Sequence, residues 1–156
     1  MSEIPTLTKR RLQAQVIGPI FAEMAAEMGE DKAAEVLHRA IAKAAIAEGR
    51  EFAAKTGGKT SMADFVKLYE LWTADGALEI DVLKSDAETF DFNVTRCRYA
   101  ETYKEMGLGK IGPILSCARD GTFCEGYDPS IKLTREKTIM AGNDCCTFRY
   151  RKEPKA

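Results

Sequence analysis

The first half of the chain has apolar residues at every third or fourth position, which is the spacing of one buried face of an α-helix. One such series covers residues 16–28, where Pro19 leaves open either one helix or two shorter ones. A second series covers residues 33–52 and a third covers residues 65–72. The pattern predicts a helical region over about residues 6–75.

From residue 77 the apolar spacing changes to two, which is the period of a strand with one buried face. The stretches "ALEIDVL" and "TFDFNVT" predict two strands, joined as a hairpin through "KSDAE". A helix over about residues 96–106 and another from Pro113 precede two further strands, at "IKL" and "CCTFRYR". We therefore predict an α+β fold, in which N-terminal helices are followed by an antiparallel sheet of about four strands that helices interrupt.

The length of the chain favours one domain. Its 156 residues, 45% of them hydrophobic, suffice for one well-buried core and are too few for two ordinary domains. We expect a single domain over residues 1–156, with a helical part at about 6–75 and a sheet-containing part at about 77–151.

The charge and the apolar segments exclude several classes of partner. Lys and Arg number 23 against 24 Asp and Glu, which gives a net charge of -1 and no field that would attract nucleic acid or an anionic membrane. The N-terminal "MSEIPTLTKRR" lacks an apolar segment after its charges, and no apolar run reaches the roughly 20 residues that a membrane span needs. We expect a soluble, cytoplasmic protein, and the sequence leaves a homo-oligomer open.

The five cysteines are an odd number in a chain without a recognisable secretion signal, so we expect reduced thiols rather than a disulfide framework. Two of them are adjacent in "GNDCC". Strand alternation places Cys146 on the side of Phe148 and Tyr150 and turns Cys145 the other way. The pair therefore does not form a two-ligand clamp, and a disulfide between neighbouring residues would be strained.

The stretch "CARDGTFC" carries candidate chemistry. If the helix from Pro113 continues, Cys117, Asp120 and Cys124 share one face, since they are spaced by three and seven positions. A thiol and a carboxylate one turn apart can act as nucleophile and base, or as two metal ligands. Alternatively, the cysteines are small core residues and Asp120 caps a neighbouring helix.

Two residues after the third strand are candidates for binding a ligand. In "LTREKT", Arg135 has a planar guanidinium suited to a carboxylate, and Thr138 can donate a hydrogen bond. The alternative for Arg135 is an ion pair with a surface acid, which contributes little to stability.

The C-terminal half, from about Phe90 to Arg151, resembles the L-2-amino-thiazoline-4-carboxylic acid hydrolase family. The resemblance is carried by "TRCRYAETYKEMGL" and by "ILSCARDGTFCEGYDPSIKLTREKTIMAGNDCCTFRYR". Glu136 departs from the family pattern, which often has Thr there. The final stretch also resembles vinyl-reductase-type small-ligand domains. The positions that match the family are Cys97, Cys117 with Asp120, Arg135 with Thr138, and Gly142 followed by Cys146, Phe148 and Tyr150.

The resemblance implies a hydrolase that opens a small cyclic amidine or amide ring at a carbon–nitrogen bond, to an N-carbamoyl or open-chain product. Its substrate would be a small anionic heterocycle, and no cofactor is implied. The catalytic residues would be Cys117, Asp120 and Cys146, and the substrate-binding residues Cys97, Arg135 and Thr138. Either a thiolate attacks the ring with Asp120 as base, or Asp120 activates a water and the cysteines line the pocket.

Two other interpretations stay open. The first is a sensory module of the vinyl-reductase type, in which the cysteines line a ligand pocket or hold a structural zinc. The second is a structural protein that assembles through its helical half and performs no chemistry.

Overall fold

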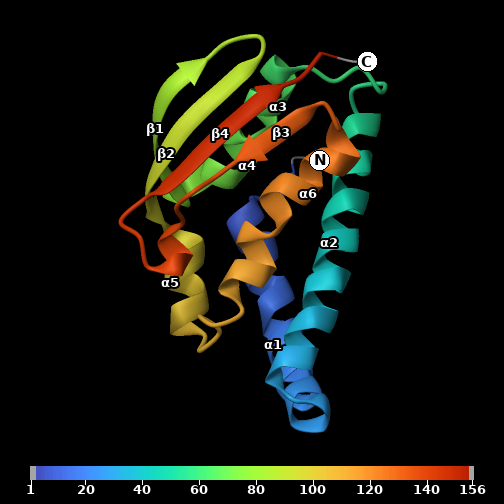
Figure 1. The fold of residues 1–156 in the computed structure, drawn as a ribbon, viewed down its shortest axis with the longest axis vertical. Helices are drawn as coiled ribbons and strands as arrows, with labels where there is room; N and C mark the ends of the chain where they lie inside the picture. Colours follow the sequence, from blue (N-terminus) through green and yellow to red (C-terminus); the bar gives the residue numbers. More distant parts are fainter. Residues whose placement is uncertain (1–2, 155–156) are drawn as a thin grey trace.

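The computed structural model describes residues 3–154 and confirms an α+β fold, with helices preceding a four-stranded antiparallel sheet (Figure 1). The elements are α1 (Thr6–Met28), α2 (Glu30–Ala54), α3 (Met62–Leu68), α4 (Glu70–Thr73), η1 (Ala74–Gly76), β1 (Leu78–Ser85), β2 (Thr89–Cys97), α5 (Arg98–Glu105), η2 (Pro113–Cys117), α6 (Arg119–Tyr127), β3 (Ile131–Thr134), η3 (Ile139–Ala141) and β4 (Cys146–Lys152).

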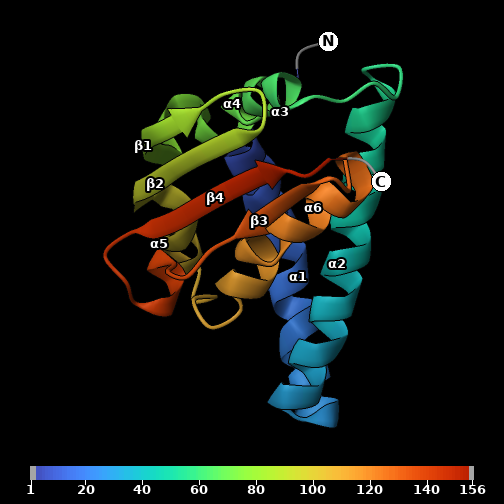
Figure 2. The same cartoon turned by 45° about the horizontal axis from the view of Figure 1, so that its top comes forward.

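The sheet has the strand order β1-β2-β4-β3, and every neighbouring pair is antiparallel. Its central strands pair Phe92 with Phe148 and Val94 with Cys146, and all four side chains are buried. Figure 2 shows the helices α1, α2 and α6 behind the sheet, so a layer of helices covers one face of the layer of strands. The expected alternation along β4 is confirmed, because Cys146 faces this inner side.

Helix α1 is continuous through Pro19, and part of its apolar series lies on the outside. Val16 and Ile20 are 63% and 53% exposed, whereas the buried residues of α1 are Thr6, Arg10 and Ala14. The reason is visible in Figure 1, where the lower ends of α1 and α2 extend past the sheet. The first half of α1 carries its fully buried residues, one of them an arginine, and Ile17 and Phe21 further along also pack against the core.

Helix α6 lies unusually close to α2, at a contact between two glycines. A Cβ atom on Gly126 would overlap the carbonyl oxygen of Ile46, and one on Gly49 would overlap that of Phe123. The two backbones can approach this closely only because neither position has a side chain. This contact holds the second half of α6 against α2.

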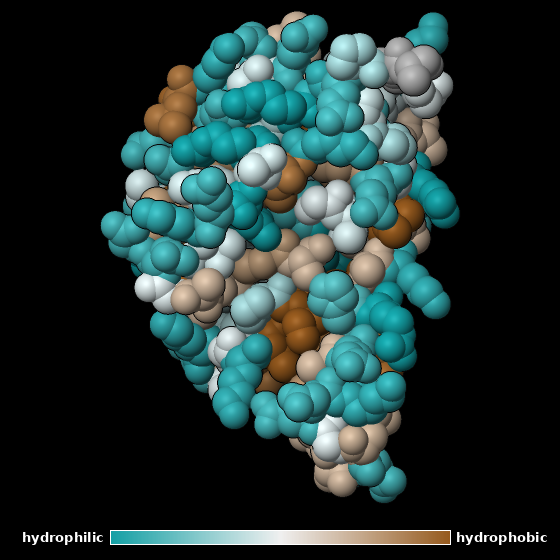
Figure 3. All heavy atoms as spheres, in the orientation of Figure 1, coloured by the Kyte–Doolittle hydropathy of each residue, from teal (hydrophilic) through white to brown (hydrophobic). Residues whose placement is uncertain are grey.

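The surface has two simple properties. The face seen in Figure 3 is mainly hydrophilic, and its largest hydrophobic patch lies below the sheet. Within residues 3–154, no helix combines the length and the apolar character that crossing a membrane requires.

Candidate functional site

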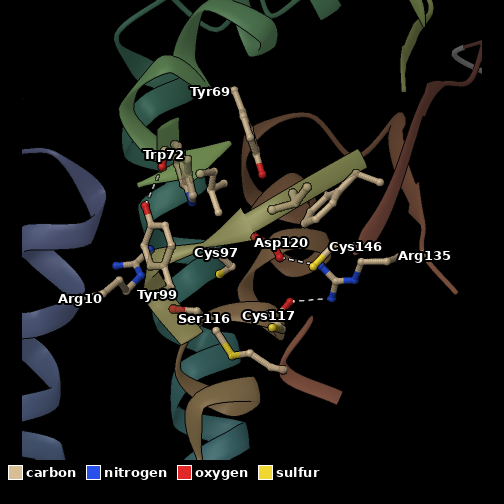
Figure 4. Close-up of a pocket in the computed structure, with 14 residues that line it drawn as sticks. Arg10, Tyr69, Trp72, Cys97, Tyr99, Ser116, Cys117, Asp120, Arg135 and Cys146 are labelled. Atoms are coloured by element: carbon tan, nitrogen blue, oxygen red, sulfur yellow. Dashed lines mark hydrogen bonds and ion pairs between the residues drawn. The ribbon is translucent and has the colours of Figure 1, made fainter. Parts of the chain in front are cut away.

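A small pocket lies between the inner face of the sheet and the helices, and it gathers residues from distant parts of the chain (Figure 4). Five of the six residues predicted from the sequence line it: Cys97, Cys117, Asp120, Arg135 and Cys146. The cavity measures about 40 Å³, which is room for a few ordered waters. The fold therefore brings together, in one pocket, five of the candidate residues that lie far apart along the chain.

Two of the three pocket thiols are held by backbone amides. Cys97 ends β2 and caps α5, where its Sγ accepts a hydrogen bond from the Ala100 amide at 3.4 Å. Cys146 begins β4, and its Sγ accepts one from the Ile139 amide at 3.1 Å. Cys117 ends the π-helical turn η2, a helix form that often marks functional sites.

Asp120 and Arg135 form an ion pair at the pocket. The Arg135 Nη1 donates to Asp120 Oδ2 at 2.6 Å, and its Nη2 donates to the Cys117 carbonyl at 3.0 Å. The guanidinium also lies over the Phe148 ring, 4.8 Å from its centroid. Arg135 was predicted to hold the carboxylate of a substrate, but its guanidinium already holds the carboxylate of Asp120.

The pocket keeps its thiols protonated at neutral pH. Burial raises the pKa of Cys97 to about 11, and burial together with the Asp120 charge raises the pKa of Cys117 to about 12. Burial also raises the pKa of Cys146. Since the thiolate is the nucleophilic form, none of the three is an activated nucleophile in this state.

Asp120 behaves differently from an ordinary surface carboxyl. Its burial raises its pKa above the usual 3.8, even though Arg135 and two further arginines favour the charged form. A carboxylate with a raised pKa is a better base, and such groups suit proton transfer near neutral pH. In Figure 4 the hydroxyl end of Tyr69 also points into this pocket.

Two residues suggested by the sequence lie outside the pocket lining. Thr138 caps η3, where its Oγ1 accepts a hydrogen bond from the Ala141 amide at 3.2 Å. Cys124 is buried and donates to the Asp120 carbonyl at 3.7 Å. The helix predicted from Pro113 is not regular, because the π-helical turn η2 and the helix α6 are separate elements. The common face predicted for Cys117, Asp120 and Cys124 is therefore only partly formed.

Several lining residues had no signal in the sequence. Arg10 on α1 is 3% exposed and reaches the pocket from near the start of the chain. Trp72 and Tyr99 are joined by a hydrogen bond from the Tyr99 hydroxyl to the Trp72 carbonyl at 2.9 Å. Ser116 shares a 2.6 Å hydrogen bond with the Tyr103 hydroxyl. Only packing of α1, α4 and α5 against the sheet brings these groups together.

The cysteines do not form a metal cage in this conformation. Over residues 3–154, no three side chains of His, Cys, Asp or Glu are placed to share one ion.

The fold and the site define a small α+β protein with a partly open pocket that three thiols and a half-buried ion pair line. The chain belongs to the L-2-amino-thiazoline-4-carboxylic acid hydrolase family, whose model matches residues 9–150. This match confirms the resemblance seen in the sequence and extends it into the helical half. The family is named for a hydrolase.

Two solved structures are similar in outline. One is a trafficking protein particle complex subunit 3 from Naegleria fowleri, covalently bound to palmitic acid, at 15% identity and a TM-score of 0.48, covering 94% of this chain and 96% of that one. The other is the phenol-responsive sensory domain of the transcription activator PoxR with phenol, at 15% identity and a TM-score of 0.49, covering 88% and 73%. Both TM-scores are below 0.5, and neither likeness bears on what this chain binds. No curated protein matches the chain.

Proposed function

We propose that this protein is a hydrolase that opens the ring of a small anionic cyclic amidine, of the kind that the family name describes. The observation that carries the proposal is the meeting of Cys117, Asp120, Arg135 and Cys146 in one pocket. Opening such a ring needs a base that takes a proton from the attacking water, and a cation that stabilises the negative charge of the base and of the adduct. Asp120 and Arg135 supply these two functions.

In the proposed reaction, a water adds across the C=N bond of the amidine. Asp120 accepts a proton from the water as the new C–O bond forms, and it returns that proton to the ring nitrogen. The adduct then collapses: Asp120 takes the proton of its hydroxyl, the carbonyl forms as a ring bond to the same carbon breaks, and the proton passes to the departing ring atom. Arg135 keeps Asp120 in place and supports the carboxylate form, and the reaction consumes one water and needs no cofactor.

The bond that breaks follows from the product. In an amino-thiazoline, the central carbon is joined to one ring nitrogen and one ring sulfur. An N-carbamoyl product keeps the carbon–nitrogen bond, so the carbon–sulfur bond breaks and the sulfur leaves as a thiol. For this substrate the ring therefore opens at carbon–sulfur, whereas a cyclic amide without sulfur would open at carbon–nitrogen.

The pocket thiols form the walls of the site in this proposal. Attack by Cys117 would require a thiolate, and its raised pKa of about 12 leaves very little thiolate at neutral pH. Burial instead raises the pKa of Asp120, which makes its carboxylate a stronger base and favours water as the nucleophile. Cys97 and Cys146 then contribute shape and apolar contact, and Thr138 supports the pocket only through η3.

A thiazoline ring is larger than the cavity, so part of the wall moves when the substrate binds. Met140 lines the pocket from the short helix η3, and its unbranched side chain adapts easily.

The test is a ring-opening assay with L-2-amino-thiazoline-4-carboxylate, together with hydantoins and lactams. Ring opening would appear as a mass gain of one water and, for the thiazoline, as a new thiol. Asp120→Asn should remove this activity, and Asp81→Asn, at an exposed position on β1, is the matched control. Absence of ring opening with every substrate would reject the hydrolase.

A non-catalytic ligand-binding module is the second candidate. It is favoured by the apolar lining of the pocket, which includes Trp72 and Phe148, and by the ion pair in which Asp120 and Arg135 bind each other. Binding of the amino-thiazoline without any ring opening would select this function over the first.

A further inference from the structure

The surroundings of the pocket hold more positive than negative charge. Three arginines with little exposure, Arg10, Arg119 and Arg135, face two carboxylates, Asp120 and Glu48. The arginines near Glu48 also act on the second carboxylate, since both Arg10 and Arg119 favour the charged form of Asp120. One positive charge is therefore left without a protein partner of opposite sign in this group. A buried charge is costly unless it is paired, so the surplus calls for an anion.

Two of the arginines are already occupied. Arg135 is held by Asp120, as described above. Arg119 lies deeper, where its Nε donates to the Leu115 carbonyl at 2.8 Å and its Nη2 to Gln13 Oε1 at 3.4 Å. Arg119 does not line the main pocket, which leaves it unable to reach a ligand there.

In the described part of the chain, Arg10 makes two hydrogen bonds, as Arg119 and Arg135 do, and one of its two is the longest of the six. Its acidic partner, Glu48, also acts on Arg119. Across residues 3–154 its hydrogen bonds are one from Nη1 to Gln13 Oε1 at 3.1 Å and a long one from Nη2 to Glu48 Oε1 at 3.5 Å. A guanidinium has five N–H donors, so part of this fork stays available. The side chain is nevertheless only 3% exposed.

Arg10 also lies where a ligand could use it. It lines the main pocket and a second, smaller hollow of about 10 Å³, and Asp120 lines both as well. In Figure 4, Arg10 comes from α1 on one side of the pocket and Arg135 from the opposite side, with Cys97 and Cys117 between them. A molecule that fills the pocket thus has a cation at one end and the Asp120–Arg135 pair at the other.

We infer that Arg10 is the carboxylate-binding residue of the pocket, and that the substrate is an anion whose carboxylate lies against α1 while its ring points toward Asp120. This inference rests on the proposed function for the nature of the ring. The carboxylate supplies the missing negative charge, and the planar guanidinium can hold it with two parallel hydrogen bonds.

The test compares two probes of nearly equal shape, L-2-amino-thiazoline-4-carboxylate and its 4-carboxamide. Binding to the full chain is measured by calorimetry, separately from ring opening. The native protein should bind the carboxylate about 30-fold more tightly than the carboxamide, as expected for a charge-assisted contact. Arg10→Met should reduce this preference to about threefold or less, and Arg11→Met, at the next and exposed position, should keep it.

Arg10→Met should still fold, because Arg119 remains to balance Glu48. If it does not, Arg10→Lys keeps the charge but loses the planar fork, and it should weaken carboxylate binding about fivefold. Equal binding of the two probes by the native protein, binding of neither, or an unchanged preference in the Arg10 variants would overturn the inference. Carboxylate-selective binding without ring opening would instead reject the hydrolase and leave the role of Arg10 standing.

Discussion

Two aspartates stand at the two ends of α6, and they have opposite properties. Asp128, just past the helix, is 3% exposed and accepts hydrogen bonds from the Ser130 amide at 3.0 Å, the Ser130 hydroxyl at 2.6 Å, the Thr60 hydroxyl at 2.7 Å, and Lys152. Asp120, in the first turn, has one such donor within residues 3–154, the guanidinium of Arg135.

The pKa of each carboxyl follows from this difference. Burial alone would raise the pKa of Asp128, but its hydrogen bonds outweigh burial and hold the pKa well below the ordinary 3.8. For Asp120, burial prevails and the pKa is raised. A carboxylate surrounded by donors is a structural anchor, whereas one with a single donor beside a cavity stays basic enough to take a proton. Burial acts in the same direction on both aspartates, and the additional donors around Asp128 lower its pKa.

Asp120→Asn should give the largest effect, a loss of roughly a thousandfold in ring opening, or ~4 kcal/mol, because the amide cannot accept the proton from water. The wild-type rate should fall as the pH drops through the raised pKa of Asp120, since only the carboxylate acts as base. The pH profile of kcat/KM checks this. An acidic limb at the ordinary aspartate value would contradict the assignment.

Asp128→Ala should leave ring opening per folded molecule intact and cost about 3 kcal/mol of stability at pH 7, because Lys152 and its neighbours lose their acceptor. A lowered folded-state pKa means that the unfolded chain binds more protons in acid. The stabilisation by Asp128 is therefore present above about pH 4 and declines below it. Urea unfolding of both proteins at pH 7 and pH 3 measures this, with Asp81→Ala as the exposed control.

Arg135→Met should cost less, about 2 kcal/mol at pH 7, and this cost should shrink as the pH is lowered. Without the guanidinium, the buried Asp120 has an even higher pKa and becomes neutral by taking up a proton. Because the folded state then binds more protons than the unfolded chain, stability falls as the pH rises through that window. Urea unfolding across this pH range measures the change. A cost that stays constant between pH 5 and pH 7 would show that Arg135 acts through packing on Phe148 alone.

Cys117→Ala should have the smallest effect, a change within about tenfold in kcat/KM, or ~1 kcal/mol, if water is the nucleophile. A loss as large as that of Asp120→Asn would show instead that the thiol attacks the ring. Trapping of a covalent intermediate by mass spectrometry would likewise identify the thiol as the nucleophile.

Much of the fold could be predicted because periodicity is a local property. Phe90, Phe92 and Val94 alternate along β2 and are all buried, as their spacing of two indicated. Gly107 follows α5 with φ of +74°, in the left-handed conformation that a glycine adopts at a helix end. On α1 periodicity predicted the helix but not which residues are buried, because Ile17 and Phe21 pack against the core whereas Val16 and Ile20 are exposed.

The candidate site was predictable only in part. The family signature pointed to the positions of Cys117, Asp120, Arg135 and Cys146, and all four line one pocket. It could not show that Arg135 is held by Asp120, because such a pairing depends on where α6 and the end of β3 meet. Arg10 carried no signal, since a basic residue within "TKRR" is ordinarily solvated.

The sequence by itself therefore determined the elements, the inward direction of Cys146 and the membership of a family, because each depends on local spacing or on a pattern of residues. Only the tertiary structure decided which charges are partners and which pKa values are raised. Those properties arise from burial and from contacts between distant segments. The close approach of α2 and α6 at Gly49 and Gly126, and the packing of α1 beside them, place Arg10 and Asp120 at one pocket.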